Sequence, residues 1–184
     1  MTPTTVARPR HFLSVTDLDA VDLERCLELA LRLKAERALG ADAPTAQALA
    51  GRYVAMLFEK PSLRTRTTFE IAVRELGGEV LALQPDVALG RREPIADVAR
   101  NLERWVHAVV IRTFSQRALE EFAAATTRLH VINALTDEQH PCRRSPISLR
   151  SRNASDRSQA GRWRSSATAT TSPLRSRMRP RCLV

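Results

Sequence analysis

Short apolar runs that alternate with helix-like segments restrict the fold of this chain more than any other feature. Runs of strand length lie at about residues 53–58, 80–83, 106–111 and 129–133. Helical periodicity fills the intervals, at about residues 65–76, 94–104 and 116–126. Strands separated by helices of this length form right-handed crossovers, which require a parallel sheet with helices on both faces. We therefore predict one α/β domain, for which about 140 residues supply a sufficient core.

A further amphipathic helix is predicted before the first strand, at about residues 17–39. Thr16 is its expected N-cap and Gly40 its expected stop. Apolar residues recur there at helical spacing, which a core helix explains without any functional role.

The segment from Phe58 to Glu70 carries the clearest chemical signal. Pro61 separates a strand that is apolar on both faces from a helix predicted to begin near Thr65. The start of a helix favours an anion, because its N–H groups are free and its dipole is positive there. Arg64 is the expected bidentate ligand of a phosphate. Ordinary capping with surface charge is the alternative that these residues alone leave open.

Other polar residues follow the predicted strands at the same edge of the sheet. Arg112 ends the third strand, and His140 lies in the loop after the fourth. Ligands of open parallel sheets bind at the carboxyl ends of the strands. We therefore expect residues 58–66, Arg112 and residues 135–140 to converge on one crevice.

These segments together resemble the aspartate/ornithine carbamoyltransferase family, over about residues 10–142. The first contains the Ser-x-Arg-Thr-Arg pattern of its carbamoyl-phosphate site, and the last resembles its N-x-L-[ST]-x-x-x-H-P segment. The triplet Phe58-Glu59-Lys60 favours the ornithine branch over the aspartate branch. Four segments carry the resemblance in the family's order: residues 58–66, 89–100, 109–112 and 132–141.

The resemblance implies transfer of a carbamoyl group from carbamoyl phosphate to ornithine, giving citrulline in arginine biosynthesis. Such a reaction needs donors aimed at oxygens that gain charge, and it needs no metal and no organic cofactor. Arg112 would bridge the phosphate and the carbonyl oxygen, and His140 would polarise that carbonyl, which makes these two the expected catalytic residues. The resemblance also implies a homotrimer. The residues expected to bind the phosphate are Ser62, Leu63 through its backbone N–H, Arg64 and Thr65.

Two other functions stay open. A carbamoyltransferase for a related amine, such as an N-acylated ornithine, would share this first domain, because the residues that select the amine lie in the family's second half. The third possibility is a non-catalytic protein with a nucleic-acid-binding tail, which we regard as the weaker explanation of the charge.

No membrane segment or targeting signal is expected, because the longest apolar stretches, near Val54 and Val109, are only of strand length. Cys26, Cys142 and Cys182 form no disulfide or metal-binding pattern. A cytoplasmic location is therefore expected.

The composition of the chain changes where the resemblance ends. Residues 143–184 carry eleven arginines and one acid, Asp156, so they contribute +10 to the net charge of +9. Residues 1–142 contribute −1. The sequence pI near 11 is thus a property of the tail alone.

A one-base frameshift after the Cys142 codon explains this change better than a genuine basic tail. Shifted back by one base, Ser165–Ser172 can encode Phe-Val-Gly-Asp-Gly-Asn-Asn-Val, which resembles the opening strand and glycine turn of the family's ornithine domain. Arg143–Ser148, with one skipped base before it, can encode Gln-Ala-Leu-Ala-Asp-Leu. We expect residues 1–142 to be the carbamoyl-phosphate-binding domain and 143–184 a non-native, disordered tail. As written, the chain is expected to be inactive.

Sequencing of the gene around the Cys142 codon tests the frameshift. Restoring one base there should open a frame that continues well past residue 184 and encodes a Gly-Asp-Gly-Asn-Asn turn. A stop codon within the next few triplets of the restored frame would contradict the prediction.

Overall fold

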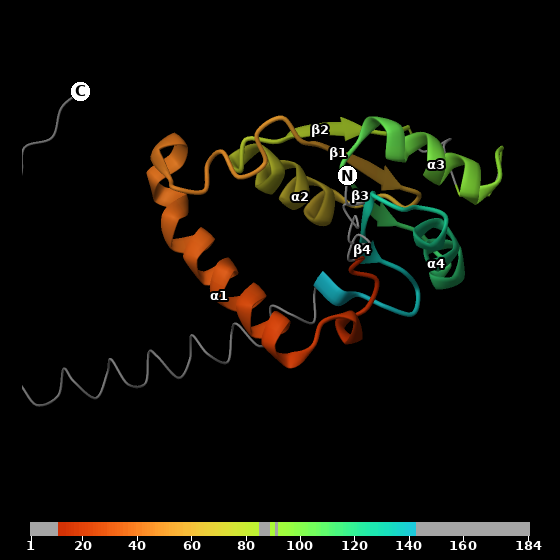
Figure 1. The fold of residues 1–184 in the computed structure, drawn as a ribbon, viewed down its shortest axis with the longest axis horizontal. Helices are drawn as coiled ribbons and strands as arrows, with labels where there is room; N and C mark the ends of the chain where they lie inside the picture. The colour runs from red at the N-terminus through yellow and green to blue at the C-terminus, as the bar shows by residue number, and fades with distance from the viewer. Residues whose placement is uncertain (1–10, 85–88, 91, 143–184) are drawn as a thin grey trace, which may run out of the picture. The chain divides into compact units, whose positions relative to one another are not determined.

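A computed structural model describes residues 11–84, 89–90 and 92–142 of the chain, which form a four-stranded sheet with helices (Figure 1). The predicted disordered tail, residues 143–184, lies outside the described residues. None of the described helices is both long and apolar enough to cross a membrane. In chain order the elements are η1 Val15–Asp17, α1 Ala20–Glu36, η2 Arg37–Asp42, β1 Tyr53–Phe58, α2 Leu63–Glu75, β2 Glu79–Ala82, α3 Ile95–Trp105, β3 Ala108–Arg112, α4 Gln116–Ala124 and β4 His130–Leu135.

The sheet is parallel throughout, as the alternation of strands and helices predicts. Its strand order is β2-β1-β3-β4, so the chain leaves β1 toward one edge and leaves β3 toward the other. The order therefore reverses between β1 and β3. In open α/β sheets, a reversal of this kind leaves a crevice at the carboxyl ends of the two strands.

Helices cover both faces of the sheet, as predicted (Figure 1). Ala55 and Leu57 of β1 pack in the cluster that contains the apolar faces of α3 and α4. Their neighbours along the strand, Val54 and Met56, pack with Val73 of α2 on the opposite face. Successive residues of a strand point to opposite faces, so a strand buried on both sides must be apolar throughout. That requirement explains the uninterrupted apolar run of β1.

The predicted boundaries agree with the structure to within two residues, except around the first helix. Thr16 was expected to cap that helix, and this prediction is wrong: Asp19 caps α1 by accepting a hydrogen bond from the Asp22 N–H at 2.8 Å. Ser14 and Asp17 instead form a capping box around the short helix η1, and an extended residue, Leu18, separates η1 from α1. Two helices, η1 and α1, therefore begin where the periodicity predicts a single helix.

The sequence predicts a glycine stop for two helices, and the structure shows it for one of them. The Gly77-Gly78 stop predicted for α2 is confirmed, since α2 ends at Glu75 and Gly77 adopts a φ of +79°. A side chain at Gly77 would also place its Cβ 2.7 Å from the Ala46 carbonyl oxygen. Gly40 does not end α1 itself, which passes into η2 after Glu36.

The segment before η1 pairs with the outer edge of β4. The Phe12 N–H donates to the Val131 carbonyl at 2.8 Å, and the Phe12 carbonyl accepts from the Asn133 N–H at 2.8 Å. The imidazole of His11 accepts a hydrogen bond from the Val131 N–H at 3.3 Å. Burial, followed by the charge of His130, lowers the pKa of His11 below 6.5, although Asp17 opposes this shift. His11 thus has a structural role, holding this segment against β4.

At the amino end of β4, one carboxylate holds the preceding turn. Glu103 of α3 accepts hydrogen bonds from the N–H groups of Thr127 and Arg128 and from the Thr127 hydroxyl. Burial tends to raise the pKa of Glu103, but these hydrogen bonds outweigh it and hold the pKa below 4.5. Ionised Glu103 therefore stabilises the fold above about pH 4.5, and this contribution is lost as the pH falls through the folded-state pKa.

We expect Glu103→Gln to lower the free energy of unfolding by roughly 1 kcal/mol at pH 7, because a neutral amide is a weaker acceptor and also brings a donor. Near pH 3 the loss should be smaller, since the contribution of the carboxylate declines as the pH falls toward its folded-state pKa. Urea denaturation at both pH values measures the two differences, and an equal loss at both would contradict the assignment.

Candidate functional site

A cavity of about 730 Å³ lies at the carboxyl end of the sheet, where the connections after β1, β3 and β4 meet. All the site residues that the sequence singles out lie on its wall, so the expected convergence is found. The lining residues are Pro61, Ser62, Leu63, Arg64, Thr65, Arg112, Leu135 and His140.

The connection after β1 brings the N-terminus of α2 to this cavity. The helix begins at Leu63, two residues earlier than expected, so Ser62 is its N-cap and Leu63 to Thr65 form its first turn. The first N–H groups of a helix have no intrahelical partner, and the Ser62 side chain makes no capping hydrogen bond. Leu63 is 83% exposed, so it can contribute only its backbone to the site. The arrangement is a donor-rich, electropositive helix end.

The two arginines of this turn have different surroundings. Arg64 lines the cavity and makes no ion pair among the described residues. Arg66 instead pairs with Glu70 one turn further along α2, with the Nε and Oε1 atoms 2.8 Å apart. The partner of Arg66 therefore lies within the helix and not in the loop before it. Arg64 is therefore the guanidinium of this turn that is available to a ligand.

Arg112 ends β3 on the opposite side of the crevice. Its Nε is buried and has no hydrogen-bond partner among the described residues. A buried donor without a partner costs about 1–3 kcal/mol, which a ligand acceptor would offset. The register of β3 and β4 shifts between Ile111 and Arg112, so Arg112 pairs with Leu135 rather than with Ala134. Irregularities of this kind often redirect a side chain at a site.

Hydrogen bonds between buried polar groups hold the loop that carries His140. The Thr136 hydroxyl donates to Gln116 Oε1 at 2.9 Å and accepts from the Gln139 N–H at 2.9 Å. Gln116 belongs to α4 and is only 7% exposed. Because Thr136 closes the turn directly before His140, this bond fixes where the half-buried imidazole enters the cavity wall.

Lys60 joins the three connections around the crevice. Its ammonium group forms an ion pair with Asp137 and lies 4.0 Å from the centre of the Phe114 ring. The Asp137 N–H in turn donates to the Phe114 carbonyl at 3.1 Å. One side chain from the β1 connection thus contacts the loops after β3 and β4.

Sequence reasoning placed Lys60, Thr136 and Asp137 in segments expected at the crevice, but it missed the contacts that these residues make. It did not assign Gln116 or Phe114 to the site. In the sequence, Lys60 and Gln116 are polar side chains next to apolar runs, and this pattern does not identify the residues that they contact. Their partners lie 77 and 20 residues away, so no local pattern reveals them. Cys142 is also close by, but burial raises its pKa to about 11, so it is a thiol and not a nucleophilic thiolate at neutral pH.

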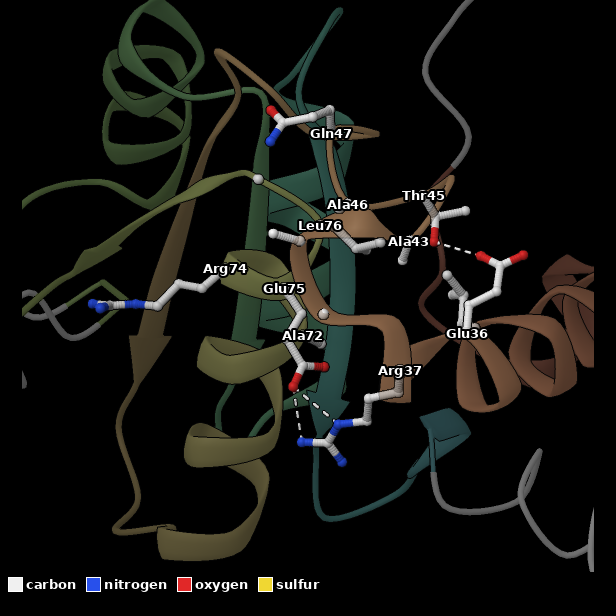
Figure 2. Close-up of a pocket in the computed structure, with 14 residues that line it drawn as sticks. Glu36, Arg37, Ala43, Thr45, Ala46, Gln47, Ala72, Arg74, Glu75 and Leu76 are labelled. Carbon is white, nitrogen blue, oxygen red and sulfur yellow. Dashed lines mark hydrogen bonds and ion pairs between the residues drawn. The ribbon is translucent and has the colours of Figure 1, made fainter.

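A second cavity, of about 410 Å³, lies between the end of α1, η2 and the end of α2. Figure 2 shows Arg37 reaching across it to Glu75, with both guanidinium contacts at 2.9 Å, and Thr45 donating to Glu36 at 2.8 Å. Both carboxylates are thus already paired. None of the predicted site residues lies there.

Comparison with known proteins relates these observations to one family. The family model described as aspartate/ornithine carbamoyltransferase, carbamoyl-P binding domain, matches residues 10–144. Ornithine carbamoyltransferase of Chromohalobacter salexigens is 48% identical over 134 residues, which are 72% of this chain and 43% of that protein. The enzyme of Methanocorpusculum labreanum is 46% identical with the same coverage. The chain spans less than half the length of these curated relatives.

Solved structures show the same relationship. Ornithine carbamoyltransferase of Thermus thermophilus has a TM-score of 0.64 and 40% identity, covering 73% of this chain and 45% of its own. That of Pyrococcus furiosus has a TM-score of 0.68 and 38% identity, with 74% and 44% covered. Acetylornithine transcarbamylase complexed with acetylcitrulline has a TM-score of 0.65 and 31% identity, with 76% and 46% covered. The family match contains the whole sheet and every residue of the crevice, and the chain therefore belongs to the aspartate/ornithine carbamoyltransferase family, with residues 10–144 corresponding to its carbamoyl-phosphate-binding domain.

Proposed function

We propose that the crevice binds carbamoyl phosphate and that the protein acts in carbamoyl transfer to ornithine. One observation carries this proposal: the helix N-terminus after β1 and the buried Arg112 Nε, from separate connections, lie on one cavity. The first suits a phosphate, and the second suits an oxygen that lies deeper in the crevice.

The phosphate end of the ligand would lie against the first turn of α2. There the Ser62 and Thr65 hydroxyls, the free backbone N–H groups and the Arg64 guanidinium can donate to phosphate oxygens. The described residues offer no acidic side chain on this wall. Donors without a neighbouring carboxylate are what a dianionic acyl phosphate requires.

The carbonyl end would lie between Arg112 and His140. As the δ-amino group attacks the carbonyl carbon, a C–N bond forms and negative charge moves to the carbonyl oxygen. The C–O bond to phosphate then breaks, phosphate leaves with the electron pair, and the attacking nitrogen gives up one proton to the departing phosphate. Donors placed at that oxygen in advance lower the barrier, because their interaction strengthens as the charge develops. We assign this role to Arg112 and His140.

Ornithine is the amine that we propose, with citrulline as the product and arginine biosynthesis as the setting. Ornithine carbamoyltransferases match at 36–48% identity, whereas acetylornithine transcarbamylase matches at 31%. The family match, residues 10–144, is to the carbamoyl-phosphate-binding domain, so the proposed amine rests on the relatives and not on residues of this match. A homotrimer and a cytoplasmic location belong to the same proposal.

Replacing Arg64 tests the phosphate site. Arg64→Ala should remove a charge-assisted contact of roughly 1.5–3 kcal/mol and so weaken carbamoyl phosphate binding about tenfold or more. Titration calorimetry on the whole chain measures this change. Arg74→Ala is the matched control, since Arg74 lies on the same helix but lines the other cavity, and it should change the affinity less than about twofold. Equal weakening by both variants would show that net charge, not a site, attracts the ligand.

The product of the gene repaired after the Cys142 codon tests the amine. With carbamoyl phosphate supplied, it should form citrulline from ornithine, while N-acetylornithine should react at least about a hundredfold more slowly, because an acyl group changes the fit at a buried polar site. The chain as given should form no citrulline. Faster reaction with N-acetylornithine would favour the alternative substrate.

A further inference from the structure

A carboxylate just outside the cavity links the two sides of the crevice. Glu59 directly follows β1, and one of its carboxylate oxygens accepts the Thr113 hydroxyl. The other oxygen accepts the Leu89 N–H at 2.8 Å. In addition, the Glu59 N–H donates to the Arg112 carbonyl at 2.9 Å. Three hydrogen bonds from one residue thus connect the ends of β1 and β3 and the segment after β2.

Two of these hydrogen bonds join residues at or close in sequence to the cavity-lining residues Ser62 and Arg112. Glu59 precedes the N-cap Ser62 by three residues, and Thr113 directly follows Arg112. Thr113 is only 1% exposed, and its N–H donates to the Leu135 carbonyl at 3.1 Å. The carboxylate therefore connects the phosphate-binding turn to Arg112 and, through Thr113, to the strand that leads toward His140.

We propose that Glu59 is a positioning residue that sets the separation between the N-terminus of α2 and Arg112, an inference that rests on the proposed function. Glu59 is not on the cavity wall, and both its oxygens are occupied, so it does not contact the ligand. A ligand held from two sides needs both sides at the correct distance, and displacement of about 1 Å can cost a hundredfold in rate.

The Glu59 carboxylate has two hydrogen-bond partners, Leu89 and Thr113, and different substitutions remove different ones of these bonds. Glu59→Ala removes both side-chain links. Glu59→Gln can keep both, because the amide oxygen can accept the Leu89 N–H while the amide NH₂ donates to the Thr113 hydroxyl, which then acts as acceptor. Thr113→Val removes the link to β3 alone. Geometry, rather than charge, should therefore decide the phenotype.

Two ligands distinguish positioning from general stability. Carbamoyl phosphate reaches both sides of the crevice, whereas inorganic phosphate needs only the turn at α2. Calorimetry on the whole chain should show carbamoyl phosphate weakened about tenfold or more by Glu59→Ala, and inorganic phosphate weakened less than about threefold. Glu59→Gln should restore carbamoyl phosphate binding to within about threefold of the original chain.

Glu103→Ala is the matched control, because Glu103 also accepts backbone N–H groups, but at the amino end of the sheet. It should leave the ratio of the two affinities unchanged. If Glu59→Ala does not fold, as judged by circular dichroism, Thr113→Val tests the same link and should shift the ratio in the same direction.

The outcomes separate the two proposals. No binding of carbamoyl phosphate by the original chain overturns the proposed function and this inference with it. Binding that is weakened by Arg64→Ala, but with an unchanged ratio in Glu59→Ala and Thr113→Val, overturns the positioning role alone. Equal weakening of both ligands by Glu59→Ala also overturns it, since that result indicates only a loss of structure.

Discussion

The parallel pairing of β1 with β3 is the constraint on which the rest of this domain depends. These strands come from distant parts of the chain, with Val54 opposite Ala108 and Phe58 opposite Arg112. Since β1 turns outward to β2 and β3 turns outward to β4, the connections that leave the central pair diverge at its carboxyl ends. The strand order therefore determines where the crevice lies. Polar residues that directly follow the central strands line it for that reason.

Apolar burial holds these strands together, whereas polar contacts fix the loops that follow them. The central strands are apolar on both faces, and several of their residues, such as Ala55 and Val109, are completely buried. Dispersion and hydrophobic contacts of this kind hold strands together but do not specify where a loop lies beyond them. That second task falls to directional groups just past the strand ends, namely the Glu59 carboxylate, the Lys60 ammonium and the Gln116 amide.

Sequence reasoning predicted the parts of this structure whose cause is local. The strand from Tyr53 to Phe58 and the stop at Gly77 follow from apolar continuity and backbone freedom, and both were correct. The start of α2 was placed too late, because Leu63 is apolar yet exposed and so breaks the periodic pattern. The bond between Glu59 and Thr113 spans 54 residues, and nothing in either neighbourhood indicates the other. Such pairs depend on which strands lie side by side, and the alternation of strands and helices in the sequence does not determine that order.

The pairing of Phe12 with β4 has a consequence for how the chain folds. It joins the first described segment to the last strand, across about 120 residues, and it covers an edge that would otherwise expose a row of backbone groups. During synthesis the amino-terminal segment emerges first but must wait for the final strand before it can pair. Closing so long a loop carries an entropic penalty that is met only when the sheet is otherwise assembled. The segment around Phe12 therefore pairs late, and until it does the outer edge of β4 is open to pairing with another chain.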